Sequence, residues 1–180
     1  LDKDNEYVAC RQGGLPGETQ ALLQANGIAE PELLERIEAS EPKCKVILTD
    51  HNEPGQSVAG LANAQIVGVV DHHRFGDFTT AAPLTIVAMP WGSSCTVVAK
   101  LFEVLGQELT DTQAKLLLSA MMTDTLMLKS PTTTDVDRAT AAKLGEQLGV
   151  DPVKFGMEVF LSRPSGSFTP EQMIRKIGRA

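Results

Sequence analysis

Short runs of apolar residues occur through the first half of the chain, and several end at a polar or acidic position. Residues 45–50 and 65–71 are rich in Val and Ile and do not alternate between apolar and polar positions. Such runs are typical of strands that are buried on both faces of a parallel sheet. We predict strands at both segments, a third at 84–89 and a weaker one at 7–10.

Helical patterns lie between these runs. Residues 18–26 and 31–39 are predicted helices, and Gly27 is expected to close the first of them. Strands and helices thus alternate through roughly the first 90 residues. This alternation favours an α/β fold with a mainly parallel sheet flanked by helices.

The second half of the chain is predicted to be helical, because helix-start signals follow one another. The signals are Ser93 or Ser94 before a helix to Leu105, Thr110 with Gln113 before a helix through Leu128, Thr134 with Asp137 before a helix ending near Gly149, and Asp151 with Pro152. We predict an α/β domain at 1–163, a Pro-, Gly- and Ser-containing linker at 164–168, and a terminal helix or the start of a further domain at 169–180.

Composition narrows the class of protein. The 180 residues include 16 Lys and Arg against 23 Asp and Glu, a net charge of −7. This balance argues against broad electrostatic binding to nucleic acid. We expect no membrane partner, since no apolar run approaches the roughly 20 residues that span a bilayer. The three cysteines show no CxxC spacing, which indicates reduced thiols and a soluble cytoplasmic protein.

All three histidines follow an aspartate at the end of a predicted strand, in Asp50-His51 and Asp71-His72-His73. Loops at the carboxyl ends of neighbouring parallel strands converge and commonly form ligand sites. We therefore expect these side chains to meet, and carboxylate with imidazole suits Mn²⁺, Mg²⁺, Fe²⁺ or Zn²⁺. The alternative is structural, because such an aspartate can cap a helix and an Asp-His pair can be only a hydrogen bond.

Asp124 lies within the almost wholly apolar segment 116–128. Burying an ionised carboxylate is unfavourable without a cation or several donors. Asp124 is therefore either a metal ligand presented by a long helix or an acceptor for the threonines beside it. Lys129 can place a cation near the same site, although Pro131 can simply end the helix.

The segment Gly92-Ser-Ser-Cys-Thr96 lies at a predicted helix start. Its hydroxyls and free N–H groups are suited to binding phosphate, and equally suited to capping the helix. The sequence leaves both readings open.

Taken together, these motifs resemble family II, manganese-dependent inorganic pyrophosphatases, a branch of the DHH phosphoesterase superfamily. The matching segments are 46–57, 69–74, 91–96, 118–125 and 129–132, and they occur in order across most of the chain. The resemblance implies a DHH-type domain, a homodimer, and hydrolysis of pyrophosphate to two phosphates by hydroxide activated at a two-metal site. The ions implied are two Mn²⁺, with Mg²⁺ or Co²⁺ as alternatives.

The resemblance also implies roles for individual residues. Asp50, His72 and Asp124 match metal ligands, with Asp50 as the bridge between the two ions. Asp71 and His73 match catalytic residues, His73 contacting the substrate phosphate and Asp71 orienting the histidine ligand. The residues expected only to line the site or to contact substrate are His51, Asn52 and Lys129.

Members of that family also carry a His-x-x-x-Asp-x-Asp motif and a basic C-terminal domain, neither of which occurs in these 180 residues. The sequence begins at Leu1 and resembles the central part of such an enzyme, either cut at both ends or diverged. Two other hypotheses remain. One is a DHH-family phosphodiesterase acting on oligonucleotides or cyclic dinucleotides, and the other is a non-catalytic domain that retains the fold.

Overall fold

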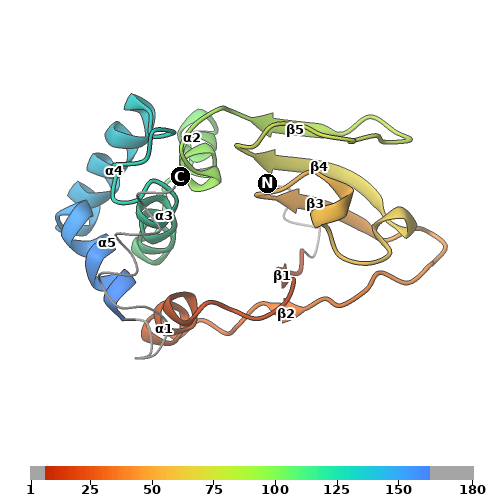
Figure 1. Cartoon of the computed structure of the whole chain (residues 1–180), viewed down its shortest axis with the longest axis horizontal. Helices are drawn as coiled ribbons and strands as arrows, with labels where there is room; N and C mark the ends of the chain where they lie inside the picture. Colours follow the sequence, from red (N-terminus) through yellow and green to blue (C-terminus); the bar gives the residue numbers. More distant parts are fainter. Residues whose placement is uncertain (1–6, 163–180) are drawn as a thin grey trace.

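A parallel sheet and a group of helices lie side by side in the computed structural model, which describes residues 7–162 (Figure 1). The sheet has the strand order β3-β4-β5, with β3 at Lys45–Thr49, β4 at Gln65–Asp71 and β5 at Thr85–Ala88. Both strand pairs are parallel. The predicted α/β class is confirmed, and each of these strands lies within one residue of its predicted bounds.

The remaining strands and the first helix form a separate edge of the molecule (Figure 1). Strands β1 (Cys10–Arg11) and β2 (Glu32–Leu33) pair in parallel, with helix α1 (Gly17–Ala25) between them in sequence. Single 3₁₀ turns at Pro54–Gln56 and Leu61–Asn63 connect β3 to β4.

The prediction of a helix at 31–39 is wrong. Its backbone N–H groups bond to distant segments instead, with Leu34 N–H donating to the Arg11 carbonyl at 2.9 Å and Ile37 N–H to the Ala59 carbonyl at 2.8 Å. Ile37 is also buried by this extended path. Helical periodicity is a weak signal, and here the tertiary pairing with β1 and with the 57–59 loop outweighs it.

The helices of the second half begin where the capping signals predict. They are α2 (Ser94–Val104), α3 (Asp111–Asp124), α4 (Asp135–Leu148) and α5 (Pro152–Leu161). The side chain preceding each helix, from Ser93, Thr110, Thr134 and Asp151, accepts a hydrogen bond from a first-turn N–H. These bonds satisfy donors that would otherwise lack a partner.

Helix α3 ends at Asp124 and not at Leu128, so the predicted end is wrong. Leu126, Met127 and Leu128 all have positive φ, at 50°, 56° and 63°. A left-handed backbone is unfavourable for residues with a Cβ. It is held here by Thr125, whose hydroxyl donates to the Met121 carbonyl at 2.6 Å and accepts from the Leu128 N–H at 3.2 Å.

The apolar core lies among the helices. Helix α3 is central, because it contacts α2, α4 and α5. The buried cluster comprises Ala114, Leu118, Met121, Met122, Ala141 and Leu144. Among residues 7–162, no helix has the length and apolar character that crossing a membrane requires. The predicted linker at 164–168 and helix at 169–180 lie outside the described residues.

Candidate metal centre

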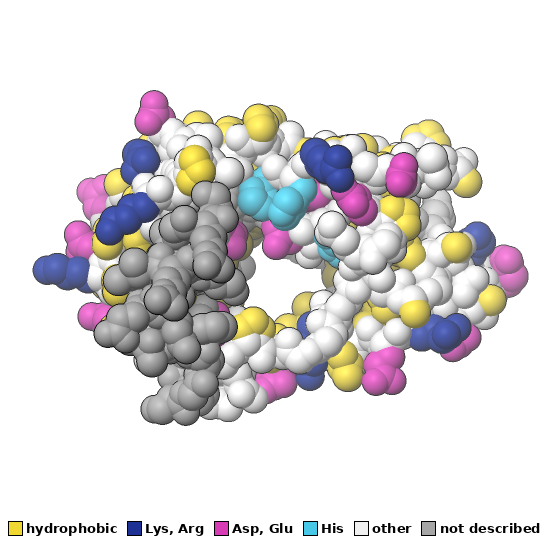
Figure 2. All heavy atoms as spheres, viewed as in Figure 1, with side chains coloured by type: hydrophobic (Ala, Val, Ile, Leu, Met, Phe, Trp, Pro, Cys, Tyr) yellow, Lys and Arg dark blue, Asp and Glu magenta, His cyan; other side chains and the backbone are white. Residues whose placement is uncertain are grey.

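The loops after β3 and β4 bring an aspartate and two histidines together. Ligand atoms of Asp50, His72 and His73 lie within 4.8 Å of one another. The His72 Nε2 atom is 3.5 Å from the Asp50 Oδ1 atom. In Figure 2, histidine and acidic side chains gather at the rim of an opening between the sheet and the helices. The expectation that the two strand ends converge is therefore met.

His72 is oriented by a backbone carbonyl. Its Nδ1 atom lies 2.9 Å from the carbonyl oxygen of Trp91. A carbonyl only accepts, so the proton of the neutral ring is on Nδ1 and the Nε2 lone pair faces Asp50. Metal-binding histidines commonly have this arrangement, with one ring nitrogen donating to a carbonyl and the other free to bind.

Asp71 is fully buried beneath the histidines. Its Oδ1 atom accepts from the backbone N–H groups of His72 and His73, at 2.7 and 3.1 Å, and lies 2.8 Å from the His73 Nδ1 atom. Its Oδ2 atom accepts from the Asn52 amide at 2.8 Å. Burial opposes ionisation, but these hydrogen bonds from Asn52, His73 and His72 outweigh it, so the pKa of Asp71 is lowered. The ring that Asp71 orients is thus that of His73.

Asp50 is exposed at the end of β3 and has a left-handed backbone, with φ at 62°. Aspartate tolerates this conformation better than most residues, and such strain is common at functional sites. The Ser94 hydroxyl donates to the Asp50 Oδ1 atom at 2.8 Å. The first turn of α2 therefore fixes one side of this carboxylate.

Asp124 reaches the same region from the end of α3. The Ser93 hydroxyl donates to its Oδ2 atom at 2.5 Å, and that hydroxyl also accepts the capping N–H of Cys95. Partial desolvation raises the pKa of Asp124; the Ser93 hydrogen bond lowers it, and the Asp50 carboxylate raises it further. Burial, with the charges of Asp124 and Asp50, raises the pKa of the Cys95 thiol to about 12. In the metal-free chain the nearby thiol is therefore protonated at neutral pH.

The segment Trp91 to Ser94 thus contacts His72, Asp50 and Asp124, a role that the sequence did not reveal. Its hydroxyls cap α2 and bind the two carboxylates, so the capping reading of this segment is supported directly. The signal in the sequence was the pair of adjacent hydroxyls before a helix.

A fourth acidic residue, Asp137, lies behind this segment and is fully buried. It accepts from the Gly92 N–H at 2.9 Å and from the Thr96 hydroxyl at 2.6 Å. It also accepts from the N–H and hydroxyl of Thr134 at 2.7 and 2.6 Å. The sequence indicated only its helix-capping contacts with Thr134.

The three residues expected to line the site have different surroundings. Asn52 is buried, and its amide joins Asp71 to the Arg74 carbonyl, at 2.8 and 2.9 Å. His51 bonds to the Thr49 carbonyl through Nδ1, whereas its buried Nε2 atom has no hydrogen-bond partner among the described residues. Lys129 is exposed, and no hydrogen bond or ion pair within 7–162 joins its side chain to the site.

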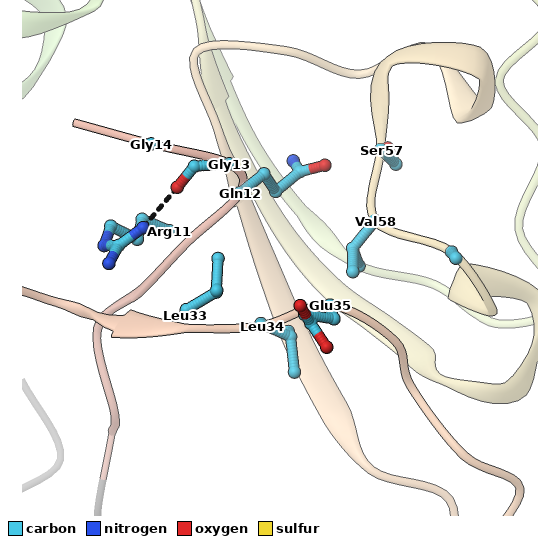
Figure 3. Close-up of a pocket in the computed structure, with 10 residues that line it drawn as sticks. Arg11, Gln12, Gly13, Gly14, Leu33, Leu34, Glu35, Ser57 and Val58 are labelled. Carbon is cyan, nitrogen blue, oxygen red and sulfur yellow. Dashed lines mark hydrogen bonds between the residues drawn. The ribbon is translucent and has the colours of Figure 1, made fainter. Parts of the chain in front are cut away.

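Two hollows differ in size and in chemistry. A hollow of about 150 Å³ adjoins the metal centre and is lined by His51, Asn52, Glu53, Gln56, His73 and Arg74. A larger one of about 450 Å³ lies between the β1–β2 pair and the 57–59 loop (Figure 3). Arg11, the cation that lines it, donates hydrogen bonds to the Gly13 and Pro31 carbonyls and forms an ion pair with Glu30. The candidate chemistry therefore lies at the smaller hollow.

Comparison with known proteins agrees with this fold. The model of the DHH family, N-terminal domain, matches residues 7–126, and the chain belongs to this family. A manganese-dependent inorganic pyrophosphatase of Methanothrix thermoacetophila is 38% identical over 88% of this chain and 50% of its own length. Another, of Methanocaldococcus jannaschii, is 38% identical over 91% of this chain and 55% of its own length.

Solved structures show the same relationship. A crystal structure of a Methanococcus jannaschii protein assigned to the family II inorganic pyrophosphatases superposes with a TM-score of 0.76 at 38% identity. The match covers 85% of this chain and 52% of that one. The chain therefore spans about half the length of the curated relatives and of this structure.

Proposed function

We propose that this chain forms part of the site of a manganese-dependent enzyme that hydrolyses inorganic pyrophosphate to two phosphates. The observation that carries the proposal is the convergence of Asp50, His72 and His73 within 4.8 Å, with Asp124 joined to the same loop through Ser93. Curated relatives with this function are 38% identical over 88% and 91% of the chain.

The donor set fits the proposed metal. Carboxylate and imidazole ligands suit Mn²⁺, and His72 already has its Nε2 atom free and directed at Asp50. Two divalent ions, when bound, would hold phosphate oxygens and lower the pKa of a coordinated water. Asp50, His72 and Asp124 would hold these ions, with Mg²⁺ or Co²⁺ as substitutes. The positive charges of the bound ions would also offset the repulsion between an acidic chain and an anionic substrate.

The remaining residues would act on the substrate. His73 is half exposed beside the smaller hollow, with its ring fixed by Asp71, so one face is available to a phosphate group. Lys129 and His51 are proposed to contribute only to the surroundings of the site. Asn52 would act as a structural link between the loops.

The proposal extends to a homodimer in the cytoplasm. Within the described residues, β5 pairs with β4 on one side only, and an unpaired strand edge can join a second copy. Cys10 and Cys44 are free and exposed, which is typical of a reducing compartment. Sedimentation of the protein under reducing conditions tests the dimer, and a monomer at all concentrations would contradict it.

Release of phosphate from pyrophosphate by the complete protein that contains this chain, measured with and without Mn²⁺, tests the function. We expect Mn²⁺-dependent release that is lost in Asp50→Ala and Asp124→Ala. Cleavage of a linear or cyclic dinucleotide in preference to pyrophosphate would instead support a DHH-family phosphodiesterase. Weak Mn²⁺ binding together with no cleavage of either substrate would support a non-catalytic domain that retains the fold.

A further inference from the structure

Asp137 contacts none of the candidate ligands, yet it holds the segment that touches three of them. The Trp91 carbonyl orients His72, the Ser93 hydroxyl binds Asp124, and the Ser94 hydroxyl binds Asp50. Between these contacts, the Gly92 N–H donates to the buried Asp137 carboxylate at 2.9 Å.

A second hydrogen bond joins Asp137 to helix α2. The Thr96 hydroxyl, which is fully buried, donates to the Asp137 Oδ1 atom at 2.6 Å. A helix-capping role needs only the contacts with Thr134. The bonds to Gly92 and Thr96 reach a different element, 45 and 41 residues away in the chain, and therefore need another explanation.

The packing around Gly92 leaves no room for a side chain. A Cβ atom added there would lie 2.8 Å from the Thr125 Cγ2 atom and 2.9 Å from the Asp137 Oδ2 atom. Thr125 is itself fully buried, directly after Asp124. At Gly92 the segment therefore packs closely against both Asp137 and the end of α3.

We propose that Asp137 is the positioning residue of the metal centre: by holding Gly92 and Thr96 it fixes the Trp91–Ser94 segment, and through it His72, Asp50 and Asp124. The inference rests on the proposed metal-binding function. Hydrogen bonds to an ionised acceptor are among the stronger ones in proteins, and four donors converge on this carboxylate. Loss of such outer partners typically weakens metal binding by about 10–100-fold.

The test compares Asp137→Asn with Asp135→Asn in the 180-residue chain. Asp135 is exposed and lies in the same first turn of α4, so it controls for the loss of a charge at this helix end. Mn²⁺ affinity, measured from the electron spin resonance signal of free Mn²⁺, should fall by about 10–100-fold in Asp137→Asn. It should change by less than about twofold in Asp135→Asn, because an exposed charge is strongly screened.

A second readout needs no metal. The chain has only three histidines, so ring ¹H–¹⁵N spectra can follow each one. We expect His72 to show a protonated Nδ1 in the wild type and in Asp135→Asn, and to exchange between tautomers in Asp137→Asn. The methyl signals of Met121 and Met122 report on the core and should stay unchanged.

The outcomes separate the two proposals. An unchanged His72 ring together with unchanged Mn²⁺ affinity in Asp137→Asn would overturn the positioning role and leave the metal site intact. Absence of Mn²⁺ binding by the wild type would overturn the proposed function, and the ring spectra would still judge the positioning role. If Asp137→Asn does not fold, Thr96→Val removes the hydrogen bond from Thr96 to Asp137 and retains the capping contacts with Thr134. It should weaken Mn²⁺ binding severalfold, with recovery in Thr96→Ser, and wild-type behaviour of Thr96→Val would refute the inference.

Discussion

The hydroxyl of Ser93 joins the beginning of helix α2 to the end of helix α3. It accepts the capping N–H of Cys95 at 3.1 Å and donates to the Asp124 carboxylate at 2.5 Å. Because an ionised carboxylate only accepts, the Ser93 proton is directed at Asp124. A single buried side chain thus serves both the stability of a helix and the geometry of the site.

We expect Ser93→Ala to lower stability and metal affinity together. Loss of an N-cap costs about 1 kcal/mol, so the urea midpoint of unfolding should fall accordingly. Calorimetric titration should show weaker Mn²⁺ binding, because the Asp124 carboxylate is no longer held. Thr110→Ala removes the N-cap of α3 and is the matched control. It should lose similar stability and retain Mn²⁺ affinity; equal affinity in both variants would argue against the role of Ser93.

Asp124→Asn should stabilise the chain in the absence of metal. Partial desolvation, and to a smaller extent the Asp50 carboxylate, disfavour the charge of Asp124 in the folded state, and an amide removes that charge while still accepting from Ser93. Thermal unfolding should therefore occur at a higher temperature in metal-free buffer. Added Mn²⁺ should then raise the melting temperature of the wild type and not that of the variant, since a ligand stabilises only the state that binds it.

Asp111→Asn, at the start of the same helix, provides the control for this change. Its carboxylate lies near a helix N-terminus, where negative charge is favourable, so its removal should slightly lower the melting temperature. A metal-free Asp124→Asn chain that melts below the wild type would contradict an unfavourable charge at Asp124 in the folded state.

The buried Asp137 should make stability depend on acid pH. Burial opposes its ionisation, but hydrogen bonds from Thr134, Thr96 and Gly92 outweigh burial and lower its pKa. A lowered pKa in the folded state stabilises the chain above the ordinary value near 3.9, and this contribution disappears as pH falls through the folded value. Asp137→Asn should thus cost about 2–3 kcal/mol at neutral pH and less below about pH 4. Urea unfolding between pH 3 and pH 7 measures this, and a constant difference would count against it.

The left-handed turn after Asp124 should reverse the usual preference for alanine over glycine. Leu126 has φ at 50°, so Leu126→Gly should be more stable than Leu126→Ala by about 1–2 kcal/mol. Leu117 lies inside α3 and is also partly buried, and there Leu117→Ala should be more stable than Leu117→Gly by about 1 kcal/mol. The urea midpoints of the four variants measure these two differences. If the alanine variant were the more stable one at both positions, the strained turn would be refuted.

Patterns in the sequence predicted the features that depend on residues close together in the chain. Unbroken apolar runs located the parallel strands, and hydroxyl or acidic side chains before periodic segments located the start of each helix in the second half. Asp50, His72 and His73 met because parallel strands end at the same edge. Segment 31–39 was mispredicted because its backbone partners are Arg11 and Ala59, which periodicity cannot indicate.

The supporting contacts of the site could not be predicted for the same reason. The hydrogen bond from His72 to Trp91 uses a backbone carbonyl as acceptor, which every residue possesses. The hydrogen bonds that Gly92 and Thr96 donate to Asp137 join residues that are far apart in the chain. Such contacts depend on how helices α2, α3 and α4 pack, and the sequence pattern carries no information on that packing.

Titration of the 180-residue chain with Mn²⁺, followed by the electron spin resonance signal of the free ion, tests the central claim most directly. The account predicts saturable binding by the wild type. In both Asp50→Asn and His72→Gln the loss of affinity should exceed the roughly 10–100-fold that follows loss of an outer partner. Glu53→Gln, beside the site but outside the proposed ligand set, should bind like the wild type. Equal Mn²⁺ binding by the wild type, Asp50→Asn and His72→Gln would show that Asp50 and His72 do not bind the ion.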